Sequence, residues 1–150
     1  MVRDIALLLL RPAGLYLALG HGWGKIVALS GGQGDRFVEG VAGLGFPAPA
    51  LFAWAAALSE FAGGICVALG LGTRVAAAFA GFTMLVAAFG RHHAHGHFLS
   101  WLGAAPASEE TLKAWGNPEL AVVYLLVFAA VALAGPGRFA VDDLLGRKGR

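Results

Sequence analysis

The stretch PALFAWAAALSEFAGGICVALGL, residues 49–71, decides the fold class of this chain. A helix needs about 20 mostly apolar residues to cross the hydrocarbon core of a bilayer, and this stretch is long enough. Its one charged side chain is Glu60. A carboxylate at such a depth costs several kcal/mol unless it is paired or faces a protected interior. The stretch therefore predicts a membrane-spanning helix that carries a candidate site.

Three further apolar stretches give four predicted spans in all, at residues 5–29, 49–71, 73–90 and 117–134. The composition agrees, because 58% of the residues are hydrophobic and 13% are charged, whereas a soluble domain has about 25% charged residues. So few charges could not cover a globular surface. We predict an all-α fold in which residues 1–150 form a single bundle of four transmembrane helices.

The connections between the spans carry patterns of their own. After the first span, Phe37, Val41 and Leu44 recur at helical spacing, which predicts a short helix on the membrane surface; a loop packed on the bundle is the alternative. The glycines of residues 70–72 predict a tight antiparallel hairpin. The polar connection at 91–116 contains a helix-start pattern at 108–113, with acidic residues in its first turn.

Charge and cysteine usage exclude several classes of protein. The net charge of +2 is too small and too scattered for a nucleic-acid partner. The lone Cys66 excludes an intramolecular disulfide and a CxxC redox pair. Lys and Arg are more frequent on the side that holds both termini, where Arg138 and Arg150 lie, and this bias predicts cytoplasmic termini. The predicted partner is the lipid bilayer.

Two predicted spans carry a charge in their interior, Arg11 in the first and Glu60 in the second. Counting about 1.5 Å per residue from the membrane edges puts Arg11 roughly 9 Å and Glu60 roughly 14 Å from the inner face. An arginine side chain can cover this difference, whereas Lys25 falls near the outer surface. We therefore predict an Arg11–Glu60 ion pair, which is either a structural clamp or a proton-handling or ligand-binding site.

A polar outer mouth is predicted near the end of the first span. His21 and Lys25 are four residues apart and share a helical face. Asn117 and Glu119 open the fourth span on the same side. For Lys25, and for Trp23 between the two, the alternative is an ordinary anchor at the lipid headgroups.

The segment RHHAHGH, residues 91–97, is the candidate for metal binding. Imidazoles bind zinc, copper, nickel and iron, and His21 or Glu119 could complete a coordination sphere. The spacing matches no known metal site. A polar loop is the favoured interpretation, and no metal site is predicted.

Several short patterns occur in a fixed order over nearly the whole chain. They are Arg11-x-x-Gly14, Gly20-His21-Gly22-x-x-Lys25, Leu44-Gly45-Phe46-Pro47, Glu60-x-x-Gly63-Gly64, Leu69-Gly70-Leu71-x-Thr73-Arg74, Glu119, and Gly135-Pro136-Gly137-Arg138-Phe139-x-x-Asp142. This order and spacing resemble the DoxX family of small bacterial membrane proteins. The resemblance implies a four-helix bundle in the bacterial inner (plasma) membrane. The linker before the fourth span is longer and more polar than the family pattern.

The resemblance also implies a function, because the family takes its name from a subunit of a thiosulfate:quinone oxidoreductase. It implies a quinone-interacting subunit of a membrane redox system, which receives electrons from a soluble redox partner or a small sulfur donor such as thiosulfate. In this interpretation Glu60 relays protons, His21 hydrogen-bonds a quinone carbonyl, and Arg11 holds Glu60 in place.

Contacts with the quinone are predicted for Lys25, Trp54 and Glu119, and the rings of Phe61 and Tyr16 would pack beside it. Two alternatives stay open. One is a non-catalytic membrane scaffold that recruits a soluble redox enzyme, and the other is a small-molecule or ion carrier that uses the buried pair. The sequence fixes neither the oligomeric state nor whether the chain is itself catalytic.

Overall fold

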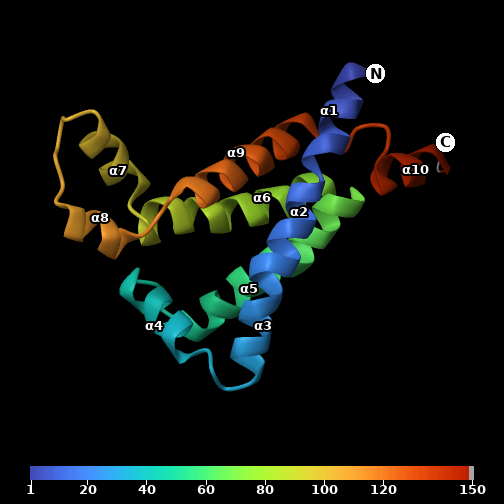
Figure 1. The fold of residues 1–150 in the computed structure, drawn as a ribbon. Coiled ribbons are helices and arrows are strands. Elements are labelled where there is room, and N and C mark those ends of the chain that lie inside the picture. Colours follow the sequence, from blue (N-terminus) through green and yellow to red (C-terminus); the bar gives the residue numbers. More distant parts are fainter. Residues whose placement is uncertain (149–150) are drawn as a thin grey trace.

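The computed structural model describes residues 1–148, and every regular element in that range is a helix (Figure 1). The predicted all-α fold is therefore confirmed. Arg150, one of the charges counted on the inner side, lies outside this range. The two ends of the described chain lie at the same end of the molecule (Figure 1).

The first apolar stretch forms an almost continuous rod. Its pieces are α1 (Val2–Leu10), α2 (Pro12–Leu17), η1 (Ala18–Gly22) and α3 (Trp23–Ser30). Pro12 has no amide hydrogen to donate, so the helical ladder is interrupted at Arg11. The η1 piece is a π-helical turn, with hydrogen bonds between residues i and i+5. This wider turn changes the direction in which the side chains after it point around the helix axis.

The next elements form a helical hairpin with a short helix beside it. They are α4 (Asp35–Gly43), α5 (Pro49–Leu69), α6 (Thr73–Leu85) and its π-helical extension η2 (Val86–Arg91). The tight hairpin is confirmed, since Gly70 and Gly72 both adopt the left-handed conformation that favours glycine. The short helix α4 is also confirmed, and its Val41 is buried.

The polar connection contains more structure than its composition indicates. It holds α7 (Ala94–Trp101) and α8 (Glu109–Trp115), and it leads to α9 (Glu119–Ala134) and α10 (Val141–Lys148). The predicted start of α8 is confirmed, because the Ser108 hydroxyl accepts a hydrogen bond from the Thr111 amide at 3.2 Å. Neither α7 nor α10 was indicated by the sequence.

The predicted number of four membrane spans is not confirmed by the helices of the structure. Within the described residues, α5 (21 residues) and the continuous α6–η2 helix (19 residues) are long and apolar enough to cross a membrane. The pair α8 and α9, bent by 48°, gives a third span if it is counted as one. The first rod is broken at Arg11 and carries His21 and Lys25, so the count of four is not confirmed.

The helices pack around a small apolar core and expose an apolar exterior. The fully buried side chains include Leu17, Val67, Phe128 and Val131. Leu133 is 80% exposed, and many other large apolar side chains of α5, α6 and α9 are also exposed. An exterior of this kind is stable against lipid and unstable in water.

The C-terminal residues 136–143 close one end of the bundle, and we call them the C-terminal latch. The Asp142 carboxylate accepts hydrogen bonds from the amides of Gly72 and Thr73 at 2.7 and 2.9 Å, and from the Thr73 hydroxyl at 2.7 Å. The Asp142 amide donates to the Gly70 carbonyl at 2.9 Å. The latch thus caps the start of α6 from a distant part of the chain.

We expect Asp142→Asn to destabilise the protein by about 1–3 kcal/mol, because a charged acceptor of three hydrogen bonds is lost. Burial acts to raise the pKa of Asp142, but the hydrogen bonds from Thr73 and Gly72 and the charge of Arg11 lower it overall. A lowered pKa in the folded state stabilises the protein above the unfolded-state value. That stabilisation is lost as the pH falls through the folded-state value.

Thermal unfolding in mild detergent as a function of pH measures both effects. The difference in melting temperature between wild type and Asp142→Asn should be constant near neutral pH and shrink under acid. Asp35→Asn, at an exposed aspartate of α4, is the matched control and should show a smaller change. A pH-independent difference would contradict the role assigned to the Asp142 charge.

Candidate functional site

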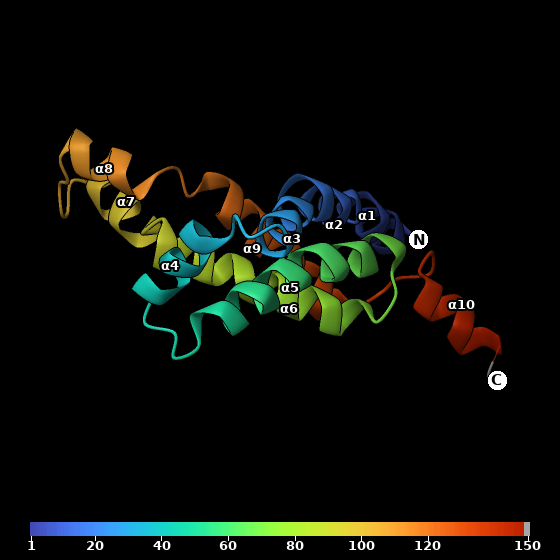
Figure 2. The ribbon, with the colours of Figure 1, turned by 90° about the horizontal axis from the view of Figure 1, so that it is seen from below.

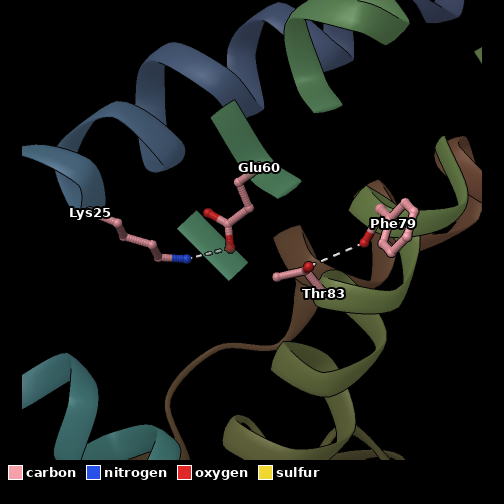
Figure 3. A network of polar contacts seen from close by, with 4 residues as sticks. All are labelled: Lys25, Glu60, Phe79 and Thr83. Atoms are coloured by element: carbon pink, nitrogen blue, oxygen red, sulfur yellow. Dashed lines mark hydrogen bonds and ion pairs between the residues drawn. The ribbon is translucent and has the colours of Figure 1, made fainter. Parts of the chain in front are cut away.

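The site is built around an ion pair between α3 and α5 (Figure 3). The Lys25 ammonium donates a hydrogen bond to Oε1 of Glu60. The Glu60 side chain is fully buried, and that of Lys25 is 29% exposed. The predicted Arg11–Glu60 pair is therefore wrong, and the partner of Glu60 is the lysine that the depth count had put out of reach.

The register between the first rod and α5 explains the correct pairing. Gly14 contacts the Gly64 backbone, and a Cβ on Gly22 would lie 2.5 Å from the Phe61 amide nitrogen. Gly22 is therefore level with Phe61 and its neighbour Glu60. Lys25 follows about one helical turn later, or about 4.5 Å along the axis, a distance that an extended lysine covers.

Arg11 lies at a different level, beside the α5–α6 turn. It is 5% exposed, and its guanidinium donates to the carbonyl oxygen of Phe139 at 2.7 Å and to that of Pro136. A Cβ on Gly70 would lie 3.0 Å from the Arg11 Cζ atom. The depth estimate failed because Arg11 was counted from the inner membrane edge and Glu60 from the outer edge. The two counts therefore did not measure the true offset between the helices. Arg11 is a structural clamp, as one interpretation proposed, but it clamps the C-terminal latch.

The second oxygen of Glu60 distinguishes this pair from an ordinary clamp. Its Oε2 atom is buried and has no hydrogen-bond partner among the residues that the structure describes. Thr83 of α6 appears in the same view, but its hydroxyl donates to the Phe79 carbonyl of its own helix at 3.1 Å (Figure 3). The carboxylate therefore keeps an unused acceptor in the interior.

Aromatic residues of the first rod, α4 and α5 contact the pair or neighbour it along the chain. The Trp23 and Phe61 rings lie 5.4 Å apart, and the Lys25 ammonium lies 5.1 Å from the Phe37 ring centre. That last distance is within the range of a cation–π contact. Trp23 is half exposed, so part of its side chain faces the outside of the bundle.

His21 lies next to the pair in the π-helical turn η1. Its ring is exposed and meets the Tyr124 ring of α9 edge-on, with centres 6.3 Å apart. Tyr124 stacks on Phe128 at 5.9 Å. Single π-helical turns occur frequently at functional sites. Tyr124 was not among the predicted residues, because nothing in the sequence aligns α9 with the first rod.

The other predicted contacts do not gather at the pair. Trp54 is half-buried and lies nearly two turns before Glu60, which rotates it about 120° around the α5 axis. Tyr16 is 73% exposed. Glu119 is exposed, and its Oε2 accepts from the Asn117 side chain at 3.3 Å. Glu119 belongs to a different surface, at the start of α9.

The histidine segment packs against Trp115 of α8. Nδ1 of His92 lies 2.9 Å from the Trp115 carbonyl oxygen, and the rings of His93 and His97 lie 5.1 and 5.6 Å from the Trp115 ring. Within the described part of the chain, no three His, Cys, Asp or Glu side chains are grouped to hold a metal ion. These contacts give His92, His93 and His97 a packing role at the base of α7.

Comparison with known proteins bears directly on the family resemblance. The family model named DoxX matches residues 6–93, more than half of the chain and including both members of the Lys25–Glu60 pair. The chain belongs to the DoxX family. It is an integral membrane protein of that family, and the predicted resemblance is confirmed.

A curated relative matches almost the whole length of this DoxX protein. It is the inner membrane protein YqjF of Escherichia coli (strain K12), 29% identical over 148 residues, which are 98% of this chain and 97% of the relative. The match supports a location in a bacterial inner membrane. No solved structure matches the chain.

The corrected pairing can be tested with two double-mutant cycles. Lys25→Met and Glu60→Gln should be strongly non-additive, with a coupling of about 1 kcal/mol or more, because each single change leaves a buried partner uncompensated. Arg11→Gln and Glu60→Gln should add within about 0.5 kcal/mol, since these residues share no contact. Melting temperatures in one detergent give all values, and the reverse pattern of coupling would restore the Arg11–Glu60 pair.

Proposed function

We propose that this DoxX protein binds the head group of a membrane quinone beside the Lys25–Glu60 pair, as the membrane subunit of a redox system. The observation that carries the proposal is the buried, unpartnered Oε2 of Glu60. Leaving such an acceptor unpaired costs about 1–3 kcal/mol, and more for a charged group. A proton or a donating ligand at Oε2 removes that cost.

The residues around Oε2 suit a ring that carries polar oxygens. Quinones, when bound, supply two-electron redox chemistry coupled to the uptake of two protons. An ammonium group has three donors, so Lys25 can bind Glu60 and still donate to a ligand carbonyl. Glu60 can hold a proton at Oε2 and return it. Trp23 and Phe61 offer aromatic surface on which a planar ring can stack.

His21 is proposed to carry protons between the pair and the end of the bundle. It lies four residues before Lys25, and its exposed imidazole is open to water or lipid headgroups. Tyr124 limits the ring's orientation through the edge-on contact. The electrons come from a separate donor, either a soluble partner protein or a small thiol or sulfur compound.

The test is quinone binding by the purified protein, with Arg11→Gln as the matched control. Arg11 is a second buried charge, but it lies at the latched end, so its loss should lower stability and leave binding intact. Lys25→Met and Glu60→Gln should each weaken binding by about tenfold or more, the value of one charge-assisted hydrogen bond.

Co-purified quinone and quenching of tryptophan fluorescence by a short-chain quinone analogue give the affinity. Equal binding by the wild type and both pair variants, all confirmed as folded, would overturn the proposal. That result would favour the scaffold alternative, in which loss of the α7–α8 connection, and not of Glu60, abolishes function.

We also propose that the latched end faces the cytoplasm. Arg3 and Arg74 donate to the carbonyl oxygens of Ala134 and Ala132 at this end, where Arg138 also lies. Lys and Arg near span ends favour the cytoplasmic side. A reporter that is active only in the cytoplasm should be active when fused to either terminus, and activity of a periplasm-only reporter there would reverse the orientation.

A further inference from the structure

A cavity of about 260 Å³ lies between α6 and α9, but a larger one, of about 650 Å³, lies at the end of the bundle away from the latch. The larger cavity falls within the range of small-molecule sites, about 300–1,000 Å³. It is an open groove lined by residues of α7, α8 and the start of α9, which lie side by side in both views (Figures 1 and 2). None of the residues of the Lys25–Glu60 pair lines it.

One wall of this cavity is aromatic and open to the outside. Phe98 and Trp101 of α7 are 58% and 80% exposed, and their rings lie 6.2 Å apart. The cavity lies just beyond the last residue of the α6–η2 span, Arg91, and at the first residue of α9, Glu119. Exposed tryptophan at the end of a span is typical of the headgroup layer of a membrane.

The opposite wall carries both signs of charge. Among the described residues, the ion-pair partner of Lys113 is the exposed Glu109, at 3.9 Å, and a pair of this kind contributes little, so the ammonium is available. The Glu119 amide donates to the Asn117 side chain at 2.8 Å, and that side chain donates back to Glu119, which fixes the carboxylate. His97 also lines the cavity, and its buried Nε2 has no partner among the described residues.

We propose that this cavity binds a phosphate ester that also carries an ammonium group, as in the head group of phosphatidylethanolamine. Lys113 holds the phosphate, and the Glu119 carboxylate holds the ammonium. A purely anionic head group would be repelled by the negative charge of Glu119. A quaternary ammonium could not donate hydrogen bonds to it. The aromatic wall of Phe98 and Trp101 covers the glycerol and the upper acyl chain.

Native mass spectrometry of the full chain, with phospholipids added one at a time, tests this site. Wild type should retain phosphatidylethanolamine at least about fivefold better than phosphatidylcholine or phosphatidylglycerol. Lys113→Gln should lose this retention, whereas Glu119→Gln should bind phosphatidylglycerol as well as phosphatidylethanolamine. Glu110→Gln, an exposed acid outside the cavity, is the matched control and should behave like wild type.

Equal retention of the three lipids by wild type, or the same preference in both cavity variants, would overturn the proposal. Soluble glycerophosphoethanolamine is added as a competitor to identify the source. If it displaces the lipid, the site recognises the head group alone, and the natural ligand can be a water-soluble ester as well as a lipid. If it does not, the acyl part is needed and the membrane is the source.

Discussion

The close contact between the first rod and α5 is the constraint on which the rest of the structure depends. Gly14 against Gly64, and Gly22 against Phe61, leave no room for a side chain between the two backbones. Two such contacts along one pair of helices fix their register to less than a helical turn. That register brings Arg11 to the α5–α6 turn and Lys25 to Glu60. A shift of one turn would leave both buried charges without their partners.

The two buried charges differ in how completely they are satisfied, and this difference separates structure from function. The guanidinium of Arg11 binds two carbonyl oxygens of the C-terminal latch. It therefore acts as a clamp that joins the start of the chain to its end. Glu60 is more deeply buried, and within the described part of the chain Lys25 binds one of its oxygens while the other has no hydrogen-bond partner. A buried oxygen without a partner is not explained by packing alone, and the proposed ligand would supply the missing donor.

The sequence predicted the elements well where hydrophobicity extends over many residues, and poorly elsewhere. The α5 and α6 helices and their hairpin follow from the apolar stretches and from the glycines at 70–72. The helices α7 and α10 are short, and contacts with distant residues support both of them. His93 and His97 pack on Trp115 at α7, and Asp142 of α10 bonds to the α5–α6 turn. Glu60 was identified correctly as buried. Its partner Lys25 was not identified, because a depth counted along one helix does not give the position of a neighbouring helix. The close contacts of Gly14 and Gly22 with α5 set that position.

The arrangement of the helices gives the two ends of the bundle different roles. At the latched end, Asp142 and Arg11 tie together the first rod, the α5–α6 turn and the end of α9. From there the rod with α5 and the pair of α6 with α9 run in different directions (Figure 1). The Lys25–Glu60 pair and the α7–α8 cavity lie toward the opposite end, where fewer bonds between distant segments hold the helices. A ligand entering from the bilayer must part side chains, and this costs least where the helices diverge. The fold thus gathers its polar clamps at the latched end, whereas Glu60 Oε2 and His97 Nε2, which have no hydrogen-bond partner among the described residues, lie away from it.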